Sequence, residues 1–423
     1  CSGRQRRRVR AAISGMMKLS HKHHNARKMD AIRPHLIMQR WNVVQHELLP
    51  ELMNEVGALT PKLERVIHTL EWVRIEEFVS ASWCGTGRPP HERSWLANAF
   101  VAKAVLGLLT TRALIDRLGA DTKLRRLCGF DLRVALPSEA TFSRAFGEFA
   151  RGELMQRVHA RMVKDMLGEH VIGHISRDST AIEARESLAK KNKVKKDKAN
   201  EVKAKAKVKR KRGRPAKDEV RPPPEPSVLE RQQGQNLEQM LAELDKGCAT
   251  GTKVNAQGYK ISWKGYKLHL DTACCGVPVS AVLSGANVHD SRVALPLSRI
   301  SAQRVVACYE LMDSAYCSSV IRQDIQAAGR VPLIDHNPRR GEKREFDPHE
   351  AQRYKTRSGA ERCSARLKDE FGARHVQVRG HAKVMCHLML GVLAPVVVKL
   401  FVAKIDQLKG VFWALVRAPV CLG

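Results

Sequence analysis

The feature that most constrains the fold is an alternation of short apolar segments and helical segments that begins at residue 171. "VIGHIS" is typical of a strand, and "YKISWKGYKLHLD" and "VPVSAVLSGANVHD" are typical of paired strands joined by a turn at Cys275-Gly276. After them the pattern predicts helix, strand, helix, strand and a final charged helix. The order β-β-β-α-β-α-β-α predicts a mixed β-sheet flanked by helices, an α/β (α+β) fold.

Residues 51–165 have a helical pattern throughout. Phe142, Phe146 and Phe149 recur at helical spacing after a start signal at Pro137-Ser138, which predicts a stripe of core-facing side chains. Arg144 projects from a different face of the same helix. The sequence therefore predicts an all-helical N-terminal domain of a kind that suits docking on DNA, with Arg144 as a candidate DNA contact. Stripes of this kind are also common where they form only a core.

The charge balance is strongly basic. The 423 residues include 74 Lys and Arg against 43 Asp and Glu, a net charge of +31. Such an excess favours polyanionic partners, with nucleic acid first and an anionic membrane surface second. The longest apolar run, residues 384–398, is too short for a membrane span and contains His387 and Pro395. The eleven cysteines form no CxxC pair, which indicates reduced thiols in a cytoplasmic protein.

A low-complexity segment carries much of the charge. Residues 187–217 contain 15 Lys or Arg against two acidic residues, too dense a charge to bury a core, and the segment is expected to be disordered. Arg212-Gly213-Arg214-Pro215 resembles an AT-hook, in which an extended Arg-Gly-Arg lies in the minor groove of A·T tracts. The alternative is a polybasic linker that contacts phosphates without preference.

Five segments follow from these patterns: a basic arm at 1–50, the helical DNA-binding domain at 51–165, a sheet domain made of 166–186 and 252–380, a Lys-rich disordered insertion at 187–251, and a C-terminal helical segment at 381–423.

Three acidic residues stand out by their context. Asp178 follows "VIGHISR", Asp313 ends the apolar run "VVACYELM", and Glu361 lies within the final helix. Carboxylates at strand ends of an α/β sheet commonly face a shared crevice. If they converge, their hard oxygens suit two ions of Mg²⁺ or Mn²⁺ and displacement at phosphorus. Asp290 and Asp271 compete for the role of Asp313.

The final helix places cations beside its carboxylate. At 100° per residue, the side chains of Tyr354, Arg357, Glu361 and Lys368 all fall within one sector of about 60° around the helix axis. A separate apolar seam contains Ala360, Leu367 and Phe371, and it predicts packing against the sheet. An aromatic ring and two cations around one carboxylate suit a surface on which a phosphate backbone lies.

Four of these positions carry a family resemblance. Tyr354-x2-Arg357-x3-Glu361-x6-Lys368 resembles the Y-(2)-R-(3)-E-(6)-K signature of one branch of bacterial insertion-sequence transposases of the DDE type. "RDST" at 177–180 and "LMDSAYCS" at 311–318, which includes Tyr316, resemble the two Asp motifs of that branch. "LCGF" and "PSEATFSR" are similar to its N-terminal domain. The resemblance covers roughly residues 55 to 400.

The resemblance implies an RNase H-like fold and a DNA transposition reaction dependent on Mg²⁺ or Mn²⁺. It implies that Asp178, Asp313 and Glu361 form the metal-binding catalytic triad and that Tyr354, Arg357 and Lys368 contact DNA. The expected partners are the terminal inverted repeats and the target DNA, bound by a homodimer associated with the nucleoid. The alternatives are a decayed or truncated copy that only binds DNA, and an RNase H-like nuclease with other substrates.

Overall fold

The computed structural model describes residues 59–79, 91–188, 226–254, 257–338, 342–394 and 396–397. The chain divides into two compact units, Cys1–Trp72 and Val73–Gly423. The first contains most of helix α4 (Pro61–Val73). The sheet and the candidate site lie in the second unit. The basic arm expected over residues 1–50 lies outside the described residues.

The second unit begins with helices that share an aromatic core. They are η3 (Ile75–Phe78), α5 (Arg93–Val105), α6 (Thr111–Ala120), α7 (Thr122–Leu127), α8 (Glu139–Arg151) and α9 (Leu154–Leu167). Ser138 caps α8 by accepting a hydrogen bond from the Thr141 amide, as the start signal predicts. The three phenylalanines of α8 are buried, with ring centroids 4.9–6.4 Å from that of Phe100 in α5. The predicted core stripe is confirmed.

In the described residues a six-stranded mixed sheet follows. Its strands are β1 (Val171–Glu183), β2 (Ala249–Val254), β3 (Lys260–Ala273), β4 (Pro278–Gly285), β5 (Val306–Met312) and β6 (Val331–Ile334). The order is β2-β3-β1-β5-β6, with β4 also paired to β3. The pairs β1–β3, β2–β3 and β3–β4 are antiparallel, and β1–β5 and β5–β6 are parallel. The expected mixed sheet flanked by helices is confirmed.

The predicted turn between β3 and β4 is also confirmed. The Gly276 amide donates a 2.7 Å hydrogen bond to the Ala273 carbonyl, and Gly276 has a φ of 79°. A side chain would be strained in this conformation, so glycine suits the position.

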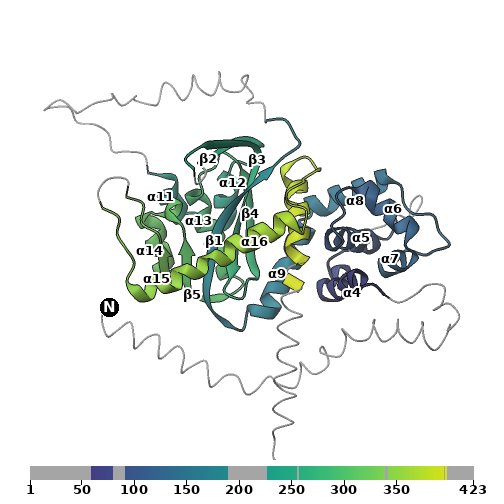
Figure 1. Cartoon of the computed structure of the whole chain (residues 1–423), viewed down its shortest axis with the longest axis horizontal. Helices are drawn as coiled ribbons and strands as arrows, with labels where there is room; N and C mark the ends of the chain where they lie inside the picture. Colours follow the sequence, from purple (N-terminus) through teal and green to yellow (C-terminus); the bar gives the residue numbers. More distant parts are fainter. Residues whose placement is uncertain are drawn as a thin grey trace, which may run out of the picture. The chain divides into compact units, whose positions relative to one another are not determined.

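Helices cover both faces of the sheet. They are α11 (Val228–Gln233), α12 (Leu237–Glu243), α13 (Ser291–Ala302), η4 (Ser314–Tyr316), α14 (Ser319–Ala327), α15 (Pro348–Tyr354), η5 (Lys355–Arg357) and α16 (Ser358–Asp369). On one face, buried side chains of α12, α13 and α14 pack with Met312 and Ile334 of the sheet. On the other, α16 contacts β1 and β3 and crosses in front of the strands in Figure 1.

Three local expectations are wrong. The insertion expected to be disordered over 187–251 contains α11, α12 and the start of β2, since Ser227 and Asn236 each form a capping box. Asp178 does not follow its strand but lies inside β1, because pairing with β3 extends to Glu183. The final helix is not continuous, since the 3₁₀ turn η5 separates α15 from α16.

Two of the three residues of the predicted apolar seam are buried in α16, whereas Phe371 follows the helix and is half-buried. Ala360 is 1% exposed and Leu367 is 2% exposed. Residues 381–394 are helical and pack on this seam where Gly391 allows close approach. A Cβ at Gly391 would lie 2.8 Å from the Phe371 carbonyl oxygen and 3.0 Å from the Leu367 side chain. No helix in the described part of the chain is long and apolar enough to cross a membrane.

Candidate active site

The sheet register brings Asp178 and Asp313 to one level. Ser176 of β1 is paired with Leu311 of β5 in the parallel ladder, and each aspartate lies two residues further along its own strand direction. Neighbouring strands are about 4.8 Å apart, so the two carboxylates start from adjacent backbone positions. Asp313 directly follows β5 and accepts a 3.0 Å hydrogen bond from the Ala315 amide, which fixes the start of η4.

Glu361 belongs to α16, the helix that lies across the sheet against β1 and β3. It lies in the first turn of α16, and its side chain is 56% exposed. Arg357 links it to the strand: the guanidinium donates one hydrogen bond to the Glu361 carboxylate, and its Nη1 lies 3.9 Å from Asp178 Oδ1. Arg357 Nη1 is buried without a hydrogen-bond partner. Arg357 thus lies against Asp178 and Glu361, and its charge also acts on Asp313.

The carboxylates influence one another electrostatically. Burial raises the pKa of Asp178 to about 6; Arg357 opposes this rise, while Asp313 and Glu361 add to it. Burial also raises the pKa of Asp313, and Asp290 and Asp335 contribute to the increase. Negative charge in this part of the site is thus incompletely compensated.

The three carboxylates are suitable ligands for a divalent cation, but their present arrangement does not form a metal site. Among the described residues, no three His, Cys, Asp or Glu side chains are gathered closely enough to hold a metal ion. The Arg357 guanidinium instead lies against both Asp178 and Glu361. The donor set consists of carboxylate oxygens, which suit Mg²⁺ or Mn²⁺. Because Glu361 is half exposed and held mainly by Arg357, a change of its rotamer is compatible with the fold.

Tyr354 and Lys368 flank this group. The Tyr354 hydroxyl donates a 3.1 Å hydrogen bond to the Met312 carbonyl, next to Asp313, and its ring centroid lies 5.9 Å from Arg357 Cζ. Burial raises the pKa of Tyr354 to about 12. Burial lowers the pKa of Lys368, with Lys253 and Arg374 contributing, whereas Asp178 acts to raise it. Tyr354 thus fixes the end of α15 to β5, and Lys368 lies within electrostatic range of Asp178.

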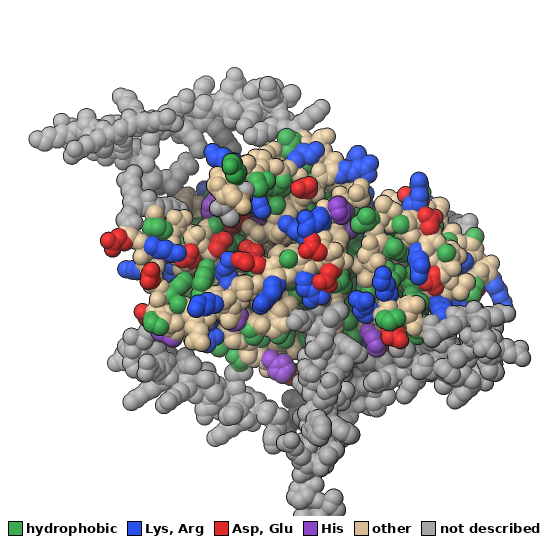
Figure 2. Space-filling view, in the orientation of Figure 1, with side chains coloured by type: hydrophobic (Ala, Val, Ile, Leu, Met, Phe, Trp, Pro, Cys, Tyr) green, Lys and Arg blue, Asp and Glu red, His purple; other side chains and the backbone are tan. Residues whose placement is uncertain are grey.

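Cationic side chains border the site. A groove of ≈ 570 Å³ extends from Ser176 of β1 and is lined by Lys355, Arg362 and Arg366. Lys and Arg, with acidic side chains among them, lie across the face that carries α15 and α16 (Figure 2). Arg144 is exposed on α8, outside this group. The AT-hook-like residues Arg212, Gly213, Arg214 and Pro215 lie outside the described residues.

The two rival aspartates are each paired with another side chain. Asp271 is fully buried and accepts two 2.8 Å hydrogen bonds from Arg177 on the opposite face of β1 from Asp178. Asp290 pairs with Lys267 at 2.9 Å. Asp271 is therefore structural, and Asp290 stands beside the site, where it raises the pKa of Asp313.

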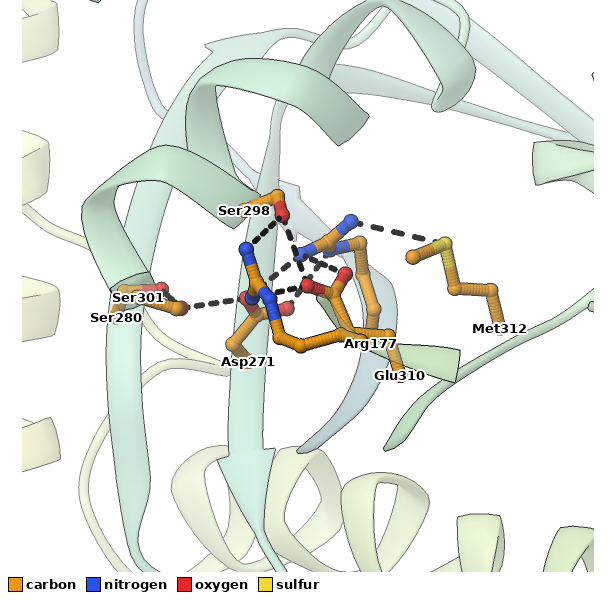
Figure 3. A network of polar contacts seen from close by, with 8 residues as sticks. Arg177, Asp271, Ser280, Ser298, Ser301, Glu310 and Met312 are labelled. Carbon is orange, nitrogen blue, oxygen red and sulfur yellow. Dashed lines mark hydrogen bonds and ion pairs between the residues drawn. The ribbon is translucent and has the colours of Figure 1, made fainter. Parts of the chain in front are cut away.

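Sequence reasoning missed the buried network around Arg177, shown in Figure 3. Arg177 also lies 3.1 Å from Glu310, which accepts a 2.8 Å hydrogen bond from Ser298 and pairs with Arg330. The Ser301 hydroxyl donates a 2.6 Å hydrogen bond to Asp271. One signal was available, because Glu310 interrupts an apolar strand, where an unpaired charge is costly. The network anchors the residue adjacent to Asp178.

The histidines on the strands have polar partners. His174 and the Thr356 hydroxyl are 3.2 Å apart, and His269 and the Ser284 hydroxyl are 2.9 Å apart. Burial lowers the pKa of His269 to about 4.

Tyr316 is 1% exposed, and its hydroxyl is one of the described buried polar groups without a hydrogen-bond partner.

Two family models match the chain. Residues 51–148 match the family described as "Transposase domain (DUF772)". Residues 242–396, which include Asp313 and Glu361, match the family described as "Transposase DDE domain". This match implies an RNase H-like fold for the sheet. No curated protein and no solved structure matches the chain.

Proposed function

Since this chain carries two transposase domains, one of them of the DDE kind, we propose that it cleaves DNA at the ends of a mobile element and joins them to a target. The observation that carries the proposal is the grouping of Asp178 and Asp313, level on adjacent strands, with Glu361 through Arg357. In the cleavage step a water oxygen bonds to phosphorus as the P–O3′ bond breaks. In the joining step the 3′-hydroxyl oxygen at the element end bonds to a phosphorus of the target DNA as the P–O3′ bond of the target breaks, and the proton of the hydroxyl passes to the leaving 3′ oxygen.

In this proposal Asp178, Asp313 and Glu361 would hold two divalent cations, Mg²⁺ or Mn²⁺. The bound cations would supply positive charge against the phosphate that reacts. Asp313 keeps its orientation through the Ala315 amide, and Tyr354 fixes the adjacent backbone at Met312. Arg357 neutralises Asp178 and Glu361 before binding and is then free to contact a DNA phosphate. Lys368 and the groove cations hold the neighbouring backbone.

We further propose that the substrate is double-stranded DNA with terminal inverted repeats and that the protein acts on it as a homodimer. The Arg212–Pro215 motif and Arg144 are proposed as additional DNA contacts outside the site. The DNA that flanks the gene supplies the substrate for a test: inverted repeats that bound the reading frame define the ends to be cleaved.

The test is cleavage of a duplex that carries those ends, with Mg²⁺ present or chelated. Asp178→Asn, Asp313→Asn and Glu361→Gln should each abolish cleavage while DNA binding is retained. Asp290→Asn is the matched control, because its carboxylate pairs with Lys267 and should leave measurable cleavage. DNA binding by the parent protein without cleavage would identify a DNA-binding remnant. Cleavage without preference for the ends would identify a nuclease.

A further inference from the structure

A second cationic cavity has none of the three candidate carboxylates in its lining. It is ≈ 320 Å³ in volume and is lined by α5 and α8 of the helical part and by residues 371–390, which follow α16. The volume is at the lower end of small-molecule pockets, which span about 300–1,000 Å³. The cavity is therefore bordered by both the helical part and the end of the sheet domain.

Lys103 of α5 lines this cavity although the residue is only 8% exposed. Burial lowers the pKa of its amine to about 8, and no acidic group of the described residues offsets this effect. Among the described residues that line the cavity, none is acidic. A buried lysine without a carboxylate partner lowers stability, so a compensating role is expected.

Further cations converge on the same cavity. Lys383 packs over α8 at Gly147, where a Cβ would lie 3.5 Å from Lys383 Cε and 3.9 Å from its Nζ. Arg379 also lines the wall. His387 remains neutral, because burial lowers its pKa to about 4, and its Nε2 lies 3.1 Å from the Gly372 carbonyl. The cavity thus presents three formal positive charges against apolar side chains such as Phe100 and Phe146.

We propose that this cavity binds a phosphate group, held by Lys103, Lys383 and Arg379, and that the phosphate belongs to the backbone of bound DNA. Phosphate oxygens accept hydrogen bonds from all three side chains. The apolar wall suits the sugar next to the phosphate. DNA as the source rests on the proposed function. One DNA segment held here is fixed to the helical part and to the sheet domain together.

The first test uses Lys103→Met in the full-length chain. Methionine keeps much of the length of the side chain and removes its buried charge, so the melting temperature should rise. DNA affinity should fall for all sequences alike, and the magnitude of the slope of log K against log salt should decrease by about 1. Lys164→Met, which removes an exposed charge outside the cavity, controls for net charge and should change the slope less. A role in packing alone would leave the slope unchanged.

Lys383 provides a second pair of variants. Lys383→Gln should reproduce the loss of DNA affinity, and Lys383→Arg should retain affinity, because arginine keeps the charge. The source of the phosphate is separated by thermal shift with inorganic phosphate or pyrophosphate. Stabilisation of the parent chain but not of Lys103→Met, with equal DNA salt slopes, would assign the cavity to a free phosphate instead of DNA.

Unchanged DNA binding in both Lys103→Met and Lys383→Gln, together with no protection by either anion, would overturn the proposal. These measurements need no cleavage. A chain without catalytic activity could still bind phosphate in this cavity, and an active one could lack that binding, so failure here is distinct from failure of the proposed function.

Discussion

At the residue scale, adjacent residues of β1 have opposite electrostatic surroundings. Arg177 lies in a buried network in which its guanidinium is shared by Asp271 and Glu310. Asp178 faces the other side of the sheet, where its nearest cation lies 3.9 Å away. The alternation of a strand thus separates a compensated charge from an incompletely compensated one.

Removal of Arg177 should strongly destabilise the fold. Arg177→Met leaves two buried carboxylates without their shared partner, and the expected loss is about 3–5 kcal/mol of unfolding free energy. The measurement is chemical denaturation of the parent and the variant. Arg112→Met is the matched control, because its pair with Glu139 is exposed and should contribute less than about 1 kcal/mol. Equal losses would show that the buried network does not stabilise the sheet.

Asp178 should make stability depend on pH. Its folded pKa of about 6 lies above the ordinary carboxyl value of 3.8, so its favourable contribution is present below pH 4 and is lost as pH rises through about 6. Asp178→Asn should therefore raise the unfolding free energy at pH 8 by up to about 3 kcal/mol, and by little at pH 4. Denaturation at both pH values measures the difference. A gain equal at both would assign it to packing instead of ionisation.

At the element scale, much of the fold could be predicted from the sequence and part of the site could not. The strands, the Gly276 turn and the stripe of α8 follow from local patterns. The two short helices α11 and α12 were missed because the Lys-rich run dominated the composition of the whole segment. Their signals are local: "SVLE" and "NLEQ" carry the residues of capping boxes.

The break between α15 and α16 could not be predicted, because η5 contains no proline or glycine that would mark it. The Arg177 network was equally hidden, since it joins residues that are adjacent only after the sheet has formed. Asp271 is an ion-pair partner and not a site carboxylate, and this too depends on contacts that exist only after the sheet has formed. Which residues carry the reaction remains a prediction.

The contact between α16 and helix 381–394 should limit the side chain at position 391. Gly391→Ala places a Cβ within 2.8 Å of the Phe371 carbonyl, so it should lower stability and displace the helix that carries Glu361. Gly119→Ala is the control: it lies in α6 with no atom within 4 Å of the added Cβ, and it should raise stability by about 0.5–1 kcal/mol. Thermal denaturation of both variants measures the contrast. A gain at position 391 would contradict close packing there.

At the scale of the whole molecule, a net charge of +31 exceeds what the site needs to hold one phosphate backbone. The groove beside α16 and the cavity at Lys103 each account for a few cations. Much of the remaining excess lies in residues 187–217. Long DNA contacts spread over several surfaces are the arrangement that such a distribution favours.

Deletion of residues 187–217 should weaken DNA binding and reduce its salt dependence, because many phosphate contacts are lost together. Titration of labelled duplex at several salt concentrations measures the slope. Comparison of A·T-rich with G·C-rich duplexes tests the Arg212–Pro215 motif. Loss of this motif should reduce only the preference of the protein for A·T-rich duplexes. A slope that does not change would show that the segment does not contact DNA.

Asp178 and Asp313 lie side by side only when β1 and β5 pair in the correct register, so the candidate site depends on correct assembly of the sheet. Backbone hydrogen bonds, not side-chain contacts, set that register. One residue inserted anywhere between 171 and 177 would turn Asp178 towards the buried network and Arg177 towards the groove. Insertions outside the ladders would leave both in place. Errors in strand alignment would therefore disrupt the candidate site and the buried Arg177 network together, and length changes over evolution should collect in the connections between strands.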